Sequence, residues 1–177
     1  MLTDTQSFSY NTRCKHASVE LLTRNVLRGF RPKWYVVFHF NDGASSQRQR
    51  KRRLDPDEVE KDLLVIKDKL YTKLYGRNWA KVKRRCRSVW GVEYGVSQVK
   101  PHINLLIEDM PYPFADYNSA LFLFNLYLPS KCKCLYKNSS HLQPVDSERG
   151  WGVNTYICKE STETNLSINL EVSDLIK

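Results

Sequence analysis

The segment VKPHINLLIED, residues 99–109, carries an imidazole and a carboxamide at alternate positions, His102 and Asn104. Its apolar and β-branched residues are typical of a β-strand, in which successive side chains point to opposite faces. His102 and Asn104 are therefore expected on one face of a sheet. The residues of the other face are expected in the core: Ile103, Leu105 and Ile107.

A carboxylate stands in the preceding apolar run, SVWGVEYG, residues 88–95, at Glu93. The two runs are separated by a short polar stretch, which predicts an antiparallel hairpin with Glu93 across from His102 and Asn104. A carboxylate oxygen, an imidazole nitrogen and an amide oxygen together suit Mg²⁺ or Mn²⁺, and the imidazole favours Mn²⁺. In the alternative interpretation, His102 is an ordinary strand histidine and the other two are polar surface residues.

A tyrosine and a lysine one helical turn apart, Tyr156 and Lys159, follow in the segment GVNTYICKES, residues 152–161. On a helix they share a face. A tyrosine hydroxyl can act as a covalent nucleophile, a metal ion can polarise the phosphate that it attacks, and a nearby cation favours the phenolate. The pair alone is a weak signal, because most Tyr-x-x-Lys pairs lie on the surface of amphipathic helices.

Four short segments resemble, in this order along the chain, motifs of the HUH endonucleases: WGVEYG, PHINLLIE, HLQPV and YICKES. The closer resemblance is to the replication initiators of plasmids and filamentous phages and to related rolling-circle transposases, and it extends from Trp34 to Ser161. It implies a site-specific nickase that acts on the single-stranded DNA of an origin or element end. Replication, transposition and conjugation cannot be separated on this basis.

In the HUH family one strand carries His-hydrophobic-His, a preceding strand an acidic ligand, and a later helix the nucleophilic tyrosine with a lysine. The resemblance implies that Glu93, His102 and Asn104 hold Mg²⁺ or Mn²⁺. It also implies that Tyr156 forms a 5′-phosphotyrosine bond and that Lys159 assists at the phosphate. Asn104 departs from the pattern, since the family usually has a second histidine there. Its amide oxygen can still ligate these ions, with a lower expected affinity.

Other histidines compete for the same role. His141-Leu142-Gln143 matches a His-hydrophobic-Gln variant of the motif, but it is too close to Tyr156 for the family's intervening helix and strand. We expect it to be the strand that leads into the nucleophile helix, with His141 or Gln143 near the site; the alternative is that it holds the metal. His39 stands on an earlier predicted strand and is expected in the core or beside the ligands.

The chain has 28 Lys and Arg against 19 Asp and Glu, a net charge of +9, which favours a polyanionic partner and above all nucleic acid. The cations gather in two clusters, one in a polar segment expected to be an exposed loop and one after a predicted helix. We expect both to contact DNA phosphates, with a merely solvated loop as the alternative for the first. The first cluster is Arg48, Arg50, Lys51, Arg52 and Arg53, and the second is Lys81, Lys83, Arg84, Arg85 and Arg87.

The elements that must position these residues predict an α+β fold, with helices packed on a central antiparallel sheet of about five strands. This is close to the ferredoxin-like and RNA-recognition folds, and the resemblance implies the HUH version of them. Asp55, Pro56 and Gly76 predict the ends of one helix, Asp116 and Pro129 those of a second. Further helices are expected over residues 17–28 and around Tyr156. Strands are expected over residues 30–40, 88–95, 99–109, 131–137 and 140–145.

One nuclease domain is expected over residues 31–165, with a tail and short helix over 1–30 and a C-terminal tail over 166–177. Neither a membrane span nor a secretory segment is expected, which favours the cytoplasm, of the host where the gene belongs to a phage or plasmid. The five scattered cysteines are expected to be reduced, and Cys132-x-Cys134 to be an ordinary pair rather than metal ligands. No Walker-type segment is present, so unwinding is expected from a host helicase, beside a host polymerase.

Other functions remain open at the level of the sequence. A non-catalytic nucleic-acid-binding module on an RNA-recognition-like sheet would use the same exposed aromatics and basic loops. It would not need Glu93, His102 and Asn104 opposite Tyr156. A transposase or relaxase of the same fold, or a phage protein with a decayed site, are the further alternatives, and Asn104 is the best support for the last.

Overall fold

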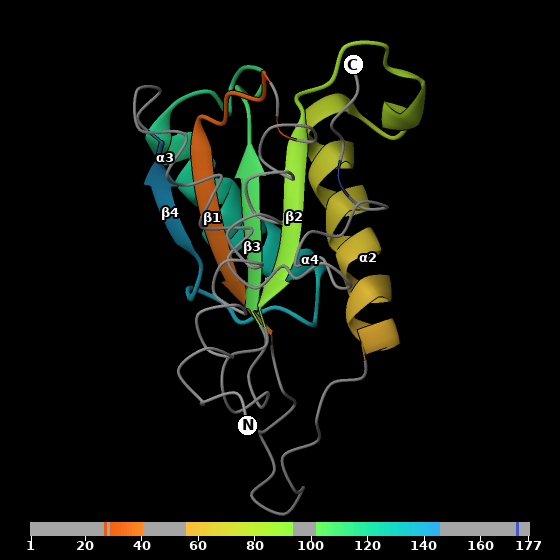
Figure 1. The fold of residues 1–177 in the computed structure, drawn as a ribbon. Helices are drawn as coiled ribbons and strands as arrows, with labels where there is room; N and C mark the ends of the chain where they lie inside the picture. Colours follow the sequence, from red (N-terminus) through yellow and green to blue (C-terminus); the bar gives the residue numbers. More distant parts are fainter. Residues whose placement is uncertain (1–26, 28, 41–55, 94–101, 146–172, 174–177) are drawn as a thin grey trace, which may run out of the picture.

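A computed structural model describes residues 27, 29–40, 56–93, 102–145 and 173. In this part of the chain the architecture is α+β, as predicted, with helices against an antiparallel sheet in the order β2-β3-β1-β4 (Figure 1). We expected about five strands, and the described residues form four. The strands are β1 (Trp34–His39), β2 (Ser88–Glu93), β3 (His102–Ile107) and β4 (His141–Pro144). The helices are α2 (Pro56–Tyr75), the 3₁₀ turn η1 (Trp79–Lys81), α3 (Tyr117–Phe122), the π-helical η2 (Leu123–Tyr127) and α4 (Leu128–Lys131).

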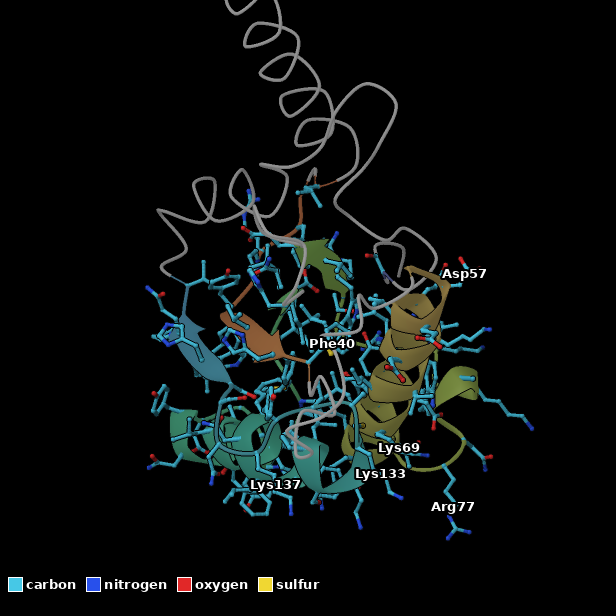
Figure 2. All side chains as sticks on the ribbon, turned by 90° about the horizontal axis from the view of Figure 1, so that it is seen from below. Phe40, Asp57, Lys69, Arg77, Lys133 and Lys137 are labelled. Atoms are coloured by element: carbon cyan, nitrogen blue, oxygen red, sulfur yellow. The ribbon has the colours of Figure 1, made fainter. Side chains whose placement is uncertain are left out.

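One face of the sheet forms the core with the helices. Side chains of a strand alternate between faces, and the sheet residues on the helical side are Trp34, Val36, Phe38, Ile103, Leu105 and Ile107, all buried. The prediction that the alternate apolar residues of β3 lie in the core is therefore confirmed. Figure 2 shows the helices as one layer against this face, with Phe40 between the layers and Lys133 and Lys137 pointing away from the sheet.

α2 begins at Pro56 and ends at Tyr75, as predicted. Proline suits the first helical position because the missing N–H would have no helical partner there. Gly76 then takes a φ of +85°, and its N–H donates to the Thr72 carbonyl at 2.9 Å, a helix end that glycine adopts without a Cβ penalty. The buried apolar face of α2 consists of Val59, Leu63, Ile66 and Leu70. Among the described residues, no helix has the length and apolarity needed to cross a membrane.

The second helical stretch is longer than predicted. Asp116 caps α3 as expected, and its side chain accepts the Ser119 N–H at 3.0 Å. The prediction that Pro129 ends this helix is wrong, because the helical path continues through η2 and α4 to Lys131. The prediction assumed that the carbonyls one turn before the proline would have no partner, which normally ends a helix.

Those carbonyls have partners from outside the helix. Pro129 has no N–H to offer the turn before it. The Asn125 carbonyl accepts the Asn138 N–H at 3.3 Å, and the Phe124 carbonyl accepts the Ser140 hydroxyl at 3.0 Å. The wider π-helical turn of η2 and these two hydrogen bonds let the proline lie inside the helical stretch. Both donors come from the residues that lead into β4.

The predicted strand KCKCLYK, residues 131–137, does not form. Lys131 belongs to α4, and the Cys132 N–H still donates to the last turn of that helix at 2.8 Å. The Leu135 N–H closes a turn on the Cys132 carbonyl at 3.1 Å, so the backbone groups that a strand would need are already used. In the part of the chain that the structure describes, the backbone contact of this segment with the sheet is limited to an isolated bridge between Leu135 and Phe40 and a hydrogen bond from the Tyr136 N–H to the His39 carbonyl at 3.1 Å.

An ion pair joins Arg87, the residue before β2, to Glu108, the residue after β3. The Arg87 Nε atom donates to Glu108 Oε1 at 2.9 Å, and the Arg87 guanidinium also donates to the Gly29 carbonyl. The Glu108 carboxylate further accepts the Arg87 N–H at 3.3 Å and the Arg31 N–H at 3.5 Å. The two side chains are only 17% and 12% exposed, so solvent screens their attraction weakly.

Replacing Glu108 with glutamine is expected to lower the free energy of unfolding by about 2–3 kcal/mol, because it removes the charge from this partly buried set of hydrogen bonds. Urea unfolding followed by circular dichroism measures the change. Asp109→Asn is the matched control: Asp109 pairs with Lys33 at 2.6 Å, but the two side chains are 74% and 43% exposed. Exposed pairs contribute at most about 1 kcal/mol. Equal losses in the two variants would contradict the structural role of Glu108.

Several predictions concern residues outside the described ranges. They are the N-terminal tail with its helix over 17–28, the Asp55 cap, the basic cluster from Arg48 to Arg53, the helix around Tyr156 and the C-terminal tail from 166. The nuclease domain predicted over 31–165 is described only in part for the same reason. These predictions stay predictions, and the roles given below to Tyr156 and Lys159 come from the sequence.

Candidate active site

Polar side chains collect on the sheet face that points away from the helices, at one end of the central strands. The register places Glu93 of β2 beside His102 of β3, and His102 beside His39 of β1. Directly paired residues share a face of the sheet, so these three form one row across it. Asn104 lies in the next row of the same face, beside Gly91. The predicted hairpin, with Glu93 opposite the His102–Asn104 pair, is confirmed.

Hydrogen bonds join these side chains into a chain. His102 Nε2 lies 2.9 Å from Glu93 Oε2, and the Asn104 amide nitrogen donates to the same oxygen at 3.4 Å. On its other side, Asn104 Oδ1 accepts the Tyr35 hydroxyl at 2.6 Å. Asn104 is only 4% exposed, so both ends of its carboxamide need partners, and both have them. The network therefore fixes which way the amide faces.

Tyr35 was missed in the sequence analysis. It lies on β1 at an even spacing from His39, so alternation alone could have placed the two on one face. What the sequence does not give is the register: Tyr35 reaches Asn104 because β1 pairs with β3 across a separation of 69 residues. Tyr35 and Glu93 together fix the orientation of the Asn104 carboxamide.

Glu93 Oε2 and His102 Nε2 are joined by a hydrogen bond in this structure, and their separation is also compatible with two ligands of one metal ion. Two ligand atoms at about 2.1 Å from an octahedral ion lie about 3.0 Å apart, close to the 2.9 Å between Glu93 Oε2 and His102 Nε2. Asn104 does not fit as it is oriented, because its oxygen accepts from Tyr35 and its amide nitrogen faces Glu93. Within the described residues, no three side chains of the His, Cys, Asp and Glu types are grouped as a metal ion would require.

The remaining histidines differ in their distance from this pair. His39 is exposed and its ring centroid lies 5.9 Å from that of His102, so it lies beside His102 and not in the core. His141 and Gln143 are exposed on β4, which pairs with the far side of β1. They share the sheet face of the site but stand two strands from β3, about 10 Å away. The structure therefore does not bring the His-Leu-Gln segment to the Glu93–His102 pair.

The second basic cluster lies at the other end of the sheet. Lys81, Lys83 and Arg84 are exposed and Arg85 is half-buried, in the stretch that leads into β2 at Ser88. Glu93 ends β2, so the strand separates the cluster from the Glu93–His102 pair by about 17 Å. Cations placed there cannot assist at the site itself, and any contact with DNA would be with a different part of the strand.

Near Asp62, the Cys132 thiol is buried and the Cys134 thiol is half-buried. Burial raises the pKa of Cys132 to about 11 and that of Cys134 to about 12. With Cys86 they form no disulfide in the described part of the chain. The expectation that Cys132 and Cys134 are not metal ligands stays a prediction.

We compared the chain with known protein families, curated proteins and solved structures. No protein-family model matches the chain, and no curated protein and no solved structure is significantly similar to it. The site offers a carboxylate and an imidazole in contact, with an oriented carboxamide beside them, on a sheet face away from the helices.

Proposed function

We propose that the chain is a metal-dependent single-strand DNA nickase of the HUH type, which initiates rolling-circle replication of a plasmid, phage or mobile element. The observation that carries the proposal is the contact between Glu93 Oε2 and His102 Nε2 at 2.9 Å, with Asn104 in the next row of the same face. An imidazole and a carboxylate held at this distance on neighbouring strands are suited to Mg²⁺ or Mn²⁺.

The order of elements supports the same proposal. The described chain runs strand, helix, strand, strand, helix, strand, with a sheet order of β2-β3-β1-β4. This succession is that of the ferredoxin-like folds, to which the HUH and RNA-recognition domains are related. In such a fold helices cover one sheet face, and nucleic-acid-binding domains of this kind use the other. Glu93, His102 and Asn104 stand on that second face. Val89, Leu106 and Asn104 are buried there, so along the central strands the part of it that is open to a nucleic-acid strand is the end with Glu93, His102 and the exposed His39.

The proposed reaction transfers a phosphate from DNA to the enzyme. The Tyr156 oxygen forms a bond to phosphorus, the bond from phosphorus to the 3′ oxygen breaks, and the phenol proton ends on the departing 3′-hydroxyl. Glu93 and His102 would hold a Mg²⁺ or Mn²⁺ ion, which would polarise the phosphate oxygens. Asn104 would join them as a ligand only with its carboxamide reversed, so that Oδ1 and not the amide nitrogen faces Glu93. Lys159 would stabilise the charge at the phosphate. A host helicase and polymerase in the cytoplasm would then use the 3′-hydroxyl.

A non-catalytic nucleic-acid-binding module is the second candidate. One observation favours it: Asn104 Oδ1 accepts a hydrogen bond from the Tyr35 hydroxyl at 2.6 Å, so this oxygen faces away from Glu93 and His102. In that case Glu93, His102 and Asn104 are a structural network. Tyr35 and the basic residues would then bind a strand by stacking and charge. A transposase or relaxase of the same fold would share the chemistry of the first candidate.

The experiment that tests the nickase uses a random-sequence single-stranded DNA library, labelled at its 3′ ends, with Mn²⁺. Because a 5′-phosphotyrosine bond retains the 3′ part of the DNA, the label should migrate with the protein on a denaturing gel. EDTA should abolish the labelled band, and duplex DNA should react poorly, since the strand must reach the site unpaired. Shortened DNA without attached protein would indicate a hydrolytic nuclease. Binding without cleavage under Mg²⁺ and Mn²⁺ would favour the binding module.

A further inference from the structure

A hollow of about 460 Å³ lies at the end of the sheet away from the Glu93–His102 pair. Three arginines line it: Arg31, which precedes β1, and Arg84 and Arg85, which precede β2. Residues far apart in the sequence therefore bring three arginine side chains to one place, where one guanidinium nitrogen of Arg31 donates to the Phe30 carbonyl at 3.3 Å. Five N–H donors in a planar fork make arginine the side chain best suited to phosphate oxygens.

The carboxylates of this hollow are engaged by other cations. Glu108 is held by Arg87, and Asp109 pairs with Lys33 at 2.6 Å. Neither Arg87 nor Lys33 lines the hollow. Each acidic charge is thus balanced from outside, and the three lining arginines leave the hollow positive overall. A positive hollow attracts anions and raises their local concentration.

The walls of the hollow are held in place before any ligand binds. The Arg85 guanidinium lies over the Trp79 ring, 5.3 Å from its centroid, and the Trp79 indole N–H donates to Asp68 Oδ1 at 3.0 Å. That hydrogen bond holds the pKa of Asp68 below its usual value, so the carboxylate stays charged and keeps its partner. The Tyr75 hydroxyl accepts the Cys86 N–H at 2.8 Å. Such preorganisation lowers the entropic cost of binding.

The remaining lining is mostly apolar or aromatic: Tyr75, Cys86, Met110 and Pro111. Cys86 and Met110 are buried, so a nucleobase would rest on the half-buried Tyr75 and Pro111, beside arginines that suit its phosphate. The combination distinguishes the hollow from the rest of the basic cluster, because Lys81 and Lys83 are exposed and do not line it.

We propose that this hollow binds a nucleotide unit, with the phosphate on Arg31, Arg84 and Arg85 and the base against the apolar lining. The proposal rests on the proposed function for the source of the nucleotide, which is a DNA strand held at a second point about 17 Å from the Glu93–His102 pair. A free nucleotide presents the same chemistry. The hollow would then anchor the strand while the other end of the sheet carries out the reaction.

The test compares two double variants of the full chain that each remove two positive charges. Binding of a fluorescent oligothymidylate is measured by anisotropy in EDTA, so that neither metal nor cleavage contributes. Arg84→Ala with Arg85→Ala is expected to weaken binding at least about thirty-fold and to lower the salt slope by about 1–2. Lys81→Ala with Lys83→Ala, the matched control, is expected to weaken it by about fivefold or less. Arg84→Lys with Arg85→Lys keeps the charge, leaves the fold less disturbed and should still lose about tenfold, because the guanidinium fork is gone.

Equal losses in the two alanine variants, or full binding by the lysine variant, would overturn the proposal. Competition separates the two sources of the nucleotide. Displacement of the oligonucleotide by ATP or dTMP, lost in the Arg84→Lys with Arg85→Lys variant, supports a site for free nucleotides, and displacement by unlabelled DNA alone supports a strand anchor. The nickase assay is independent of this result. If the hollow binds as expected but the protein forms no covalent adduct, the nucleotide site is supported and the nickase function is rejected.

Discussion

Replacement of Tyr156 with phenylalanine is expected to eliminate the covalent protein–DNA adduct, with a fall in the rate of cleavage of about 10⁴-fold or more. The change keeps the aromatic ring and its packing but removes the oxygen that attacks phosphorus. Binding of single-stranded DNA should persist, because binding depends on phosphate contacts and stacking elsewhere. The adduct is measured as 3′-labelled DNA attached to the protein on a denaturing gel, and binding by anisotropy.

Tyr35→Phe is the matched control, since it removes one hydroxyl from another tyrosine. The Tyr35 hydroxyl donates to Asn104 Oδ1 at 2.6 Å and forms no bond in the proposed reaction. We expect this variant to keep the adduct. If Tyr35→Phe loses the adduct while Tyr156→Phe keeps it, the nucleophile has been assigned to the wrong residue.

The second large effect is expected at the Glu93–His102 pair. Glu93→Gln and His102→Ala should each reduce cleavage by about 10²–10³-fold, because each removes a ligand of the ion that stabilises the developing charge. Part of the lost activity should return at higher Mn²⁺ concentration, as expected for weakened binding of the ion. The free energy of unfolding should change by less than about 1.5 kcal/mol for Glu93→Gln, which keeps the shape of the side chain.

His141→Ala provides the control for this pair. His141 is exposed on β4 and stands two strands away from β3, so its removal should leave cleavage unchanged. Cleavage rates are compared under the same Mn²⁺ concentration for all three variants. The opposite pattern, with His141 required and His102 dispensable, would transfer the site to the His-Leu-Gln segment.

The parts of the fold that could be predicted from the sequence depend on short-range patterns. Alternation in HINLLI placed His102 and Asn104 on one face, and the helical spacing after Pro56, with Gly76 at its end, gave α2. Such patterns follow from the geometry of one element and need no knowledge of its partners. The position of Glu93 across from His102 also followed, because a short connection favours pairing of adjacent strands.

What could not be predicted depends on contacts between distant segments. The helix passes Pro129 because Asn138 and Ser140 supply the missing donors, and no local rule reveals them. The residues of KCKCLYK have strand-like composition, but their backbone groups complete a helix end and a turn. Tyr35 meets Asn104 only through the register of β1 with β3, so this contact, which orients the carboxamide together with that to Glu93, could not be predicted from the sequence.

Pro129 has a consequence for a different element. β4 is an edge strand of four residues, paired only with β1, and only Leu142 of its side chains is buried. A slip of one residue would turn Leu142 out to solvent and carry its neighbours to the other face. The carbonyls that Pro129 leaves open are bound by Asn138 and Ser140, which fixes the point at which the chain enters β4. Through these two hydrogen bonds, Pro129 helps to fix the register of β4 against β1.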